Sequence, residues 1–115
     1  MQYETILRNF FTAWQKRDWD SVESLLADGF TFTSPYDNHI NKHEYKQKCW
    51  NAVKEIEEYE YVTIIEKGNE AFVWYKSWIN GTSVQNTEHF LFHNGKIQEV
   101  NVFFGRPEDA MPKGA

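Results

Sequence analysis

Only one cysteine, Cys49, occurs in the 115 residues of this sequence, which excludes an internal disulfide bond. No apolar run approaches the roughly 20 residues that cross a bilayer, and the first residues lack the basic and apolar segments of a signal peptide. Basic residues number 12 against 17 acidic ones, and the net charge of −5 argues against a nucleic-acid surface. We therefore expect one cytoplasmic domain that binds neither membranes nor nucleic acids.

Aromatic residues, by contrast, are abundant. They make up 17% of the chain, with five tryptophans, six tyrosines and nine phenylalanines. Such side chains bring a large apolar area and stiff walls. They suit a ligand pocket, a dimer interface or both. The chain contains no internal repeat, low-complexity segment or linker.

Three segments place apolar residues at helical spacing: 3–14, 19–26 and 42–56. Asp18 is expected to cap the second helix. Asn41 and Glu44 have the spacing of a capping box at the start of the third helix.

Five further segments have the alternation typical of strands: 30–33, 59–65, 71–79, 87–92 and 97–104. Asn80-Gly81 and Asn94-Gly95 are hairpin signals, so the last four strands should form an antiparallel meander. The pattern predicts an α+β fold in the order α-α-β-α-β-β-β-β, with three N-terminal helices packed on a curved antiparallel sheet. We place the domain at residues 1–106 and an irregular C-terminal tail at 107–115.

The predicted strand 71–79 is apolar on both faces. One parity holds Val73, Tyr75, Ser77 and Ile79, and the other holds Phe72, Trp74, Lys76 and Trp78. A sheet with one wet face should show polar residues on one parity, so something must cover the second face. A second copy of the chain is the simplest cover. We expect a homodimer through the outer sheet face, with Trp74 and Trp78 in the interface.

Five short phrases carry a resemblance to a known family: FFTAW at 10–14, LLADGFTF at 25–32, SPYD at 34–37, NGKI at 94–97 and VFFG at 102–105. In this order they resemble the SnoaL-like branch of the nuclear transport factor two-like superfamily, over roughly residues 3–106. The resemblance implies a cone-shaped α+β barrel, in which a bent sheet curls around the long first helix and encloses a ligand cavity. Members commonly dimerise through the outer sheet face, and they include isomerases, cyclases, epoxide hydrolases, dehydratases and non-catalytic binding domains.

The ketosteroid isomerases of this superfamily supply a test of activity. Their base and their two hydrogen-bond donors fall, by position, on Ser34, Phe10 and Glu88. Phe10 cannot donate a hydrogen bond, and Ser34 alone is no useful base. Isomerisation by that mechanism is therefore not expected. The epoxide hydrolases of the family bridge carboxylates with an arginine, but no arginine of this chain lies in the middle of a predicted strand.

Glu88 remains as a candidate for catalysis. It shares its parity with Phe90 and Phe92, and the family register points this parity into the cone. A carboxyl group among apolar side chains should have a raised pKa, because burial disfavours its charged form. It can then act as a general acid or base near neutral pH. Alternatively, Glu88 pairs with a neighbour such as Tyr75 or Ser77, or lies at a wet mouth.

Helix spacing, strand parity and the family register together predict the side chains that line the cavity. They are Phe10, Trp14, Phe32, Tyr36, Trp50, Val73, Tyr75, Ser77, Phe90, Val100, Val102 and Phe104. A slip of one residue in any strand would turn the side chains of that strand outward. Tyr36 lies in a turn, where packing is the alternative to ligand contact.

No metal site and no cofactor are expected. His89 and His93 share a strand face but stand roughly 13 Å apart at strand rise. His39 and His43 lack a carboxylate partner at ligand spacing. Cys49 lies on an apolar helix face, where an inert core thiol is expected rather than a nucleophile.

Two functions from different classes stay open. The first is a binding module that holds a small apolar or aromatic ligand in the conical pocket without chemistry. The second is an enzyme of lyase, isomerase or cyclase type that uses Glu88 as general acid or base. The absence of the other catalytic groups favours the first, whereas a buried Glu88 without a charged partner would favour the second.

Overall fold

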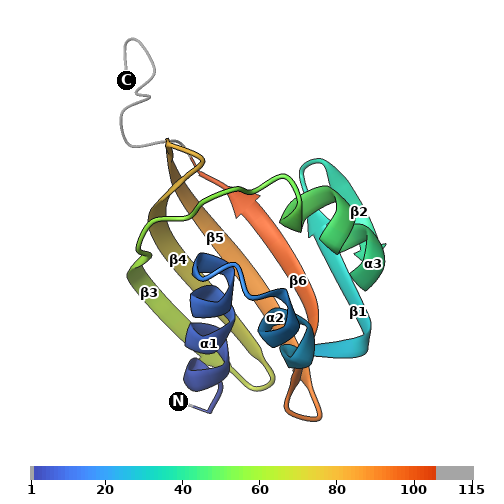
Figure 1. Ribbon diagram of the computed structural model, residues 1–115. Helices are drawn as coiled ribbons and strands as arrows, with labels where there is room; N and C mark the ends of the chain where they lie inside the picture. Colours follow the sequence, from blue (N-terminus) through green and yellow to red (C-terminus); the bar gives the residue numbers. More distant parts are fainter. Residues whose placement is uncertain (1, 106–115) are drawn as a thin grey trace.

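The computed structural model describes residues 2–105, and the expected tail at 107–115 lies outside that range. Two helices, α1 (Glu4–Gln15) and α2 (Trp19–Leu25), lie across one face of a six-stranded sheet (Figure 1). The strands are β1 (Leu26–Ser34), β2 (Asp37–Asn41), β3 (Glu60–Lys67), β4 (Glu70–Ile79), β5 (Thr82–His93) and β6 (Lys96–Phe104). Between β2 and β3, the short helix α3 (Lys42–Tyr45) continues into a π-helical turn, η1 (Lys46–Trp50).

This arrangement confirms the predicted cone-shaped α+β fold, but the sheet differs from the expected one in detail. Its order is β2-β1-β6-β5-β4-β3, and β1 runs parallel to β6 while the other neighbours are antiparallel. β1 ends at Ser34 and β6 begins only at Lys96, so no tight turn dictates their relative direction. The sheet bends without closing into a barrel, because β2 and β3 remain as its two edges.

The strand β2 was not anticipated from the sequence. It follows the turn at Pro35 and returns along β1, with Phe32 opposite Ile40. The sequence around Pro35 predicts the end of a strand, but it gives no sign that the chain turns back into a second strand. This extra hairpin extends the sheet beyond β1 and carries Asp37 to one end of the fold.

The local signals at the helix starts are confirmed. The Asp18 side chain accepts a hydrogen bond from the backbone N–H of Ser21 and caps α2. Asn41 and Glu44 form both bonds of a capping box at the start of α3. The apolar stripe of α1 is buried as its spacing predicts, and it comprises Leu7, Phe10, Phe11, Ala13 and Trp14.

The third helix ends earlier than predicted. The backbone N–H of Asn51 bonds to the carbonyl of Lys46 at 3.1 Å, five residues back, which is the wider π-type turn. Residues 51–59, called the strap from here on, then run as irregular chain to β3. Ile56 is still buried, so the apolar spacing of this segment reflects its packing rather than a helix.

Asn80 fastens the strap to the turn between β4 and β5. Its Oδ1 accepts hydrogen bonds from the backbone N–H groups of Lys54 and Glu55, at 2.7 and 3.2 Å. Its Nδ2 donates to the carbonyl of Ala52 at 3.0 Å. Its own backbone N–H donates to the carbonyl of Glu55 at 3.0 Å, so one residue holds the strap through four bonds.

The two faces of β4 are used differently. Val73, Tyr75 and Ser77 are buried on the helix side, whereas Trp74 and Trp78 point to the opposite side and are 41% and 47% exposed. No helix of the described chain covers that outer face (Figure 1). No helix within residues 2–105 has the length and apolar character needed to cross a membrane.

Replacing Asn80 with Gly should loosen the strap while keeping the turn, because Gly adopts a positive φ without strain but lacks the side-chain amide that makes three of the four bonds. We expect the free energy of unfolding to fall by about 1–2 kcal/mol, with faster amide hydrogen exchange at Lys54 and Glu55. Asn94→Gly is the matched control, because Asn94 also precedes a glycine in a hairpin turn at positive φ and makes no bond to the strap. Equal losses in the two variants would show that Asn80 does not hold the strap.

Candidate functional site

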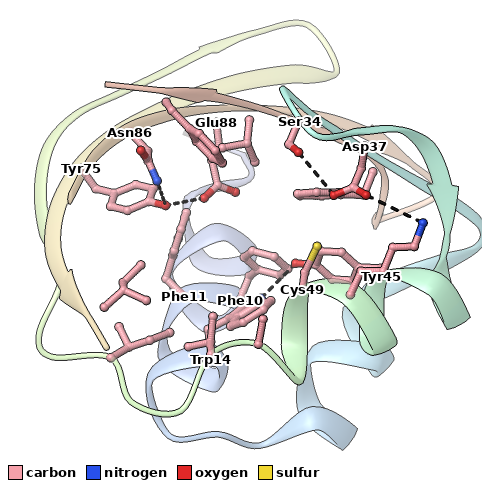
Figure 2. A pocket seen from close by; sticks show the side chains of 18 of the residues that line it. Phe10, Phe11, Trp14, Ser34, Asp37, Tyr45, Cys49, Tyr75, Asn86 and Glu88 are labelled. Atoms are coloured by element: carbon pink, nitrogen blue, oxygen red, sulfur yellow. Dashed lines mark hydrogen bonds and ion pairs between the residues drawn. The ribbon is translucent and has the colours of Figure 1, made fainter. Parts of the chain in front are cut away.

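A cavity of about 290 Å³ lies between α1, the strap and the concave face of the sheet (Figure 2). Its walls are mainly apolar, and α1 contributes the aromatic side chains Phe10, Phe11 and Trp14. Helical spacing explains this wall, because residues four apart share one helix face and the next residue lies beside them. Polar groups gather around Glu88 on β5 and around Asp37 on β2.

Glu88 is the buried acidic group of the cavity. Its side chain enters from β5, and the residue is only 8% exposed. Tyr75 on β4 donates a hydrogen bond from its hydroxyl to Glu88 Oε2 at 2.6 Å. Asn86 Nδ2 in turn donates to the Tyr75 oxygen at 3.2 Å, so the chain of donors points at Glu88 (Figure 2). Among residues 2–105, no basic side chain forms an ion pair with Glu88.

Burial raises the pKa of Glu88 from 4.5 to about 7, against the smaller opposing effect of the Tyr75 hydrogen bond. At neutral pH both the protonated and the ionised form are therefore populated. A carboxyl group in this state can accept or release a proton at little cost, which is the requirement for general acid–base chemistry.

The second polar group lies toward the mouth of the cavity. Ser34 Oγ donates to Asp37 Oδ2 at 3.4 Å, and Lys48 Nζ lies 4.0 Å from Asp37 Oδ1. Ser34 Oγ also accepts from the backbone N–H of Tyr36 at 3.1 Å. The turn that ends β1 and the π-helical turn thus meet across Asp37, which is paired with a cation in a way that Glu88 is not.

The segment α3–η1 supplies Tyr45 and Cys49 to the same cavity. Trp14 Nε1 donates a hydrogen bond to the Tyr45 hydroxyl oxygen at 3.1 Å. Burial raises the pKa of the Cys49 thiol to about 12, with smaller contributions from the charges of Asp37 and Glu88. The thiol is therefore protonated at neutral pH, which agrees with the inert role expected from the sequence.

Seven of the twelve side chains expected in the pocket border the cavity. They are Phe10, Trp14, Phe32, Tyr36, Tyr75, Val102 and Phe104. Tyr36 and Phe104 lie at the mouth, where their rings contact one another at a centroid distance of 5.7 Å and both remain exposed. Tyr36 therefore borders the opening without being enclosed by it.

The other five expected residues are buried but do not border the cavity: Trp50, Val73, Ser77, Phe90 and Val100. Four of them lie on the expected face of their strands, and Trp50 lies in η1. Phe10 and Phe11 pack edge-on against Phe90, at centroid distances of 5.5 and 5.9 Å. Trp50 packs on Trp14 at 4.6 Å.

Ser77 was also considered as a partner of Glu88, and the structure corrects this. Its hydroxyl donates to the backbone carbonyl of Glu57 in the strap, at 3.1 Å. Of the two partners considered, only Tyr75 bonds to Glu88.

Several site residues were missed by the sequence reasoning. Asn86 lies two residues before Glu88 on the same strand face, and a correct start of β5 would have included it. Tyr45 lies on the apolar face of the predicted third helix, but helical spacing does not show that its ring borders the cavity. Tyr59 lies in the irregular strap, where periodicity gives no signal. Asp37 was placed in a turn without a role.

No three potential metal-ligating side chains cluster anywhere in the part of the chain that the structure describes. His89 lies on the outer sheet face, where its Nε2 is 2.8 Å from Glu70 Oε1 and its Nδ1 is 3.0 Å from Asn101 Nδ2. His39 lies 3.6 Å from Glu99 on the same face. These contacts join strands and lie on the side of the sheet away from the cavity.

The bent sheet, the long helix beneath it and the cavity between them define a conical α+β protein with an internal site. Residues 7–100 match the SnoaL-like domain, and the chain belongs to this family. No curated protein matches the sequence.

Solved structures of other proteins share this fold. An NTF2-like protein of unknown function from Cytophaga hutchinsonii is 19% identical, with 86% of each chain covered and a TM-score of 0.75. A LEH-like epoxide hydrolase from M. tuberculosis is 19% identical, with 86% of this chain and 79% of that chain covered and a TM-score of 0.68.

A third structure is a hypothetical protein from Catenulispora acidiphila with a ketosteroid isomerase-like fold, in complex with trimethylamine. It is 12% identical, with 87% of this chain and 85% of that chain covered and a TM-score of 0.69. At these identities the likenesses establish the fold and leave the activity to be argued from the site.

Replacing Glu88 with Gln tests the environment of the carboxyl group. A folded-state pKa near 7, above the ordinary 4.5, stabilises the native state below pH 4.5, and this stabilisation is lost as pH rises through 7. Gln does not ionise, so its free energy of unfolding does not fall in this way. The difference in free energy of unfolding between variant and parent should therefore shift in favour of the variant by up to about 3 kcal/mol as pH rises from 4.5 to 8. Urea unfolding at the two pH values measures this difference.

Glu58→Gln, in the exposed strap, is the matched control and should leave the pH dependence of stability unchanged. If the Glu88 variant and the parent show the same pH dependence, the carboxyl group is not held in a desolvating site.

Proposed function

We propose that this protein binds a small, largely apolar molecule in the cavity and that Glu88 exchanges a proton with it as a general acid or base. The observation that carries this proposal is the position of Glu88: a buried carboxyl group with a pKa of about 7, at the wall of an aromatic cavity and without an ion-pair partner among the described residues. A reaction of lyase, isomerase or cyclase type fits such a group.

The proposed proton transfer involves the ligand, Glu88 and Tyr75. The ionised Glu88 takes a proton from a carbon atom beside a carbonyl group of the ligand, and the electron pair of the C–H bond moves toward the carbonyl oxygen. The protonated Glu88 then returns the proton to the same carbon or to another one. Tyr75 remains bonded to Glu88 throughout and steadies its charged form.

The dimensions of the cavity favour a small ligand. Its volume of about 290 Å³ lies at the lower limit of known small-molecule sites. The wall formed by Phe10, Phe11 and Trp14 favours a flat or compact apolar body. Two neighbours of the same fold are consistent with small-molecule chemistry, since one is an epoxide hydrolase and the other holds trimethylamine.

Binding without chemistry is the second candidate. It is favoured by Phe10 and Ser34, which occupy positions where the isomerases of the superfamily have a donor and a base. In this case the protein would hold the same kind of ligand, and Glu88 would serve only to orient it.

An exchange experiment in D2O separates the two candidates. A panel of small aryl and cyclic ketones is incubated with the protein, and deuterium entering beside the carbonyl group is followed by NMR. We expect exchange of at least one ketone faster than in buffer, rising with pH through about 7 as Glu88 ionises, and lost in Glu88→Gln. Ligand binding that shifts the cavity resonances without any exchange would favour the binding module.

We further propose a homodimer through the outer sheet face. Large apolar side chains project from that face on three strands and remain exposed: Ile65, Phe72, Trp74, Trp78 and Phe103. A second copy presents the same apolar surface and can match it about a two-fold axis. A stable interface would bury on the order of 1,200–2,000 Å² in total.

Sedimentation tests the dimer directly. The parent protein should sediment as a dimer at micromolar concentration, and the double variant Trp74→Lys with Trp78→Lys should sediment as a monomer. Tyr36→Lys is the control, because Tyr36 is 84% exposed but lies at the cavity mouth rather than on the outer face. A monomeric parent protein would contradict the proposal.

A cytoplasmic location belongs to the same proposal. It is supported by the single cysteine, which suits a reducing compartment.

A further inference from the structure

Four tyrosines border the cavity; Tyr36 lies exposed at its mouth, and the fold uses the hydroxyl groups of the other three to different extents. The Tyr75 hydroxyl is used fully, because it accepts from Asn86 and donates to Glu88. The Tyr45 hydroxyl accepts from Trp14, but no described residue accepts its hydrogen. The Tyr59 hydroxyl, at the end of the strap, makes no hydrogen bond within residues 2–105.

Tyr45 is the better held of the two hydroxyls that are left over. An indole N–H can only donate, so the Tyr45 oxygen must be the acceptor in its 3.1 Å bond with Trp14 Nε1. The ring is packed against Phe30 and Phe32, at centroid distances of 5.1 and 4.8 Å. The residue is only 3% exposed, so its oxygen has a fixed position at the cavity wall (Figure 2).

A buried hydroxyl whose hydrogen has no acceptor is unfavourable, and native structures seldom leave such a group without a partner. Burial, together with the nearby charge of Glu88, raises the pKa of Tyr45 well above its ordinary value. Tyr45 is therefore protonated at every pH at which the protein works, and its hydrogen is available to a ligand.

We propose that Tyr45 orients the ligand, by donating a hydrogen bond from its hydroxyl group to an oxygen atom of the molecule bound in the cavity. This inference rests on the proposed function, since it assigns a second polar contact within the same cavity. Trp14 acts through Tyr45 as a positioning residue, because its indole N–H directs the Tyr45 lone pair and leaves the hydrogen for the cavity.

The chemical class of the ligand follows from these contacts. An oxygen that accepts from Tyr45 belongs to a carbonyl group or a similar neutral acceptor. An anionic ligand is disfavoured because Glu88 and Asp37 both border the cavity, and Lys48 already lies 4.0 Å from Asp37. The ligand is therefore a small neutral carbonyl compound with an apolar body that packs on the α1 rings.

Two probes of nearly equal shape test this inference. Acetophenone carries a carbonyl oxygen, whereas α-methylstyrene has a CH₂ group in its place and cannot accept a hydrogen bond. Their dissociation constants are measured by NMR titration with the parent protein and with Tyr45→Phe. We expect the variant to bind acetophenone about 3- to 10-fold more weakly, the factor that one hydrogen bond between neutral groups supplies, and to bind α-methylstyrene unchanged within twofold.

The α-methylstyrene titration also reports whether the variant keeps its cavity. Tyr45→Phe leaves the Trp14 N–H without an acceptor, so the comparison is repeated on a Trp14→Phe background, where adding Tyr45→Phe should again weaken acetophenone binding and leave α-methylstyrene binding unchanged. Tyr59→Phe is the matched control, because Tyr59 borders the same cavity, and it should weaken neither probe.

Each result bears on the inference in a definite way. Equal weakening of both probes by Tyr45→Phe, or a selective loss in Tyr59→Phe instead, would overturn the role of Tyr45 and leave the proposed function standing. If neither probe binds the parent protein up to its solubility limit, the inference and the proposed small-molecule function fail together.

Discussion

The 2.6 Å hydrogen bond from Tyr75 to Glu88 joins two adjacent strands inside an aromatic interior. Desolvation of a carboxyl group is costly, and a single hydroxyl donor offsets only part of that cost. The Tyr75 ring has to be held in place for this bond to form. It packs edge-on against Phe11 of α1 and Tyr59 of the strap, at 5.1 and 5.2 Å. The helix, the strap and the sheet thus all contribute to the position of one acidic group.

The same arrangement keeps the cavity open. Aromatic rings that meet edge to face cannot slide past each other to fill a space as flexible side chains do. The strap completes the wall, and it is attached through backbone bonds to Asn80 and through the hydroxyl of Ser77. A rigid cavity of this kind can place a ligand atom close to Glu88 without collapsing when empty.

The fold could be predicted from the sequence because its signals are local and repeated. Helical spacing in α1, the caps at Asp18 and Asn41, and the alternation in β4 each depend on a few neighbouring residues. The parallel pairing of β1 with β6 has no such local signal, and neither does the change from helix to π-turn after Tyr45.

The site was predictable to the extent that it lies on regular elements. Strand parity placed Glu88 and Tyr75 on the concave face, and helical spacing placed Phe10 and Trp14. Strand parity cannot distinguish a side chain that borders the cavity from one that a neighbouring ring covers. Parity therefore predicts Phe90 in the pocket, although Phe10 and Phe11 pack against it. The position at which the isomerases of the superfamily have a hydrogen-bond donor holds Phe10, which cannot donate. The hydroxyl group of Tyr45 comes from α3 rather than α1, so a comparison of positions along α1 does not reveal it.

The parallel pairing of β1 with β6 also governs the order in which the chain can assemble. β3 to β6 are consecutive and can pair as each leaves the ribosome, since only short turns separate them. β1 is made before these four strands but finds its partner only when β6, the last of them, has emerged. Until then, Phe30 and Phe32 have β2 beside them and no sheet to join. The nascent chain therefore carries an unfinished apolar edge until β6 has been made, and the walls of the cavity are complete only when this strand docks.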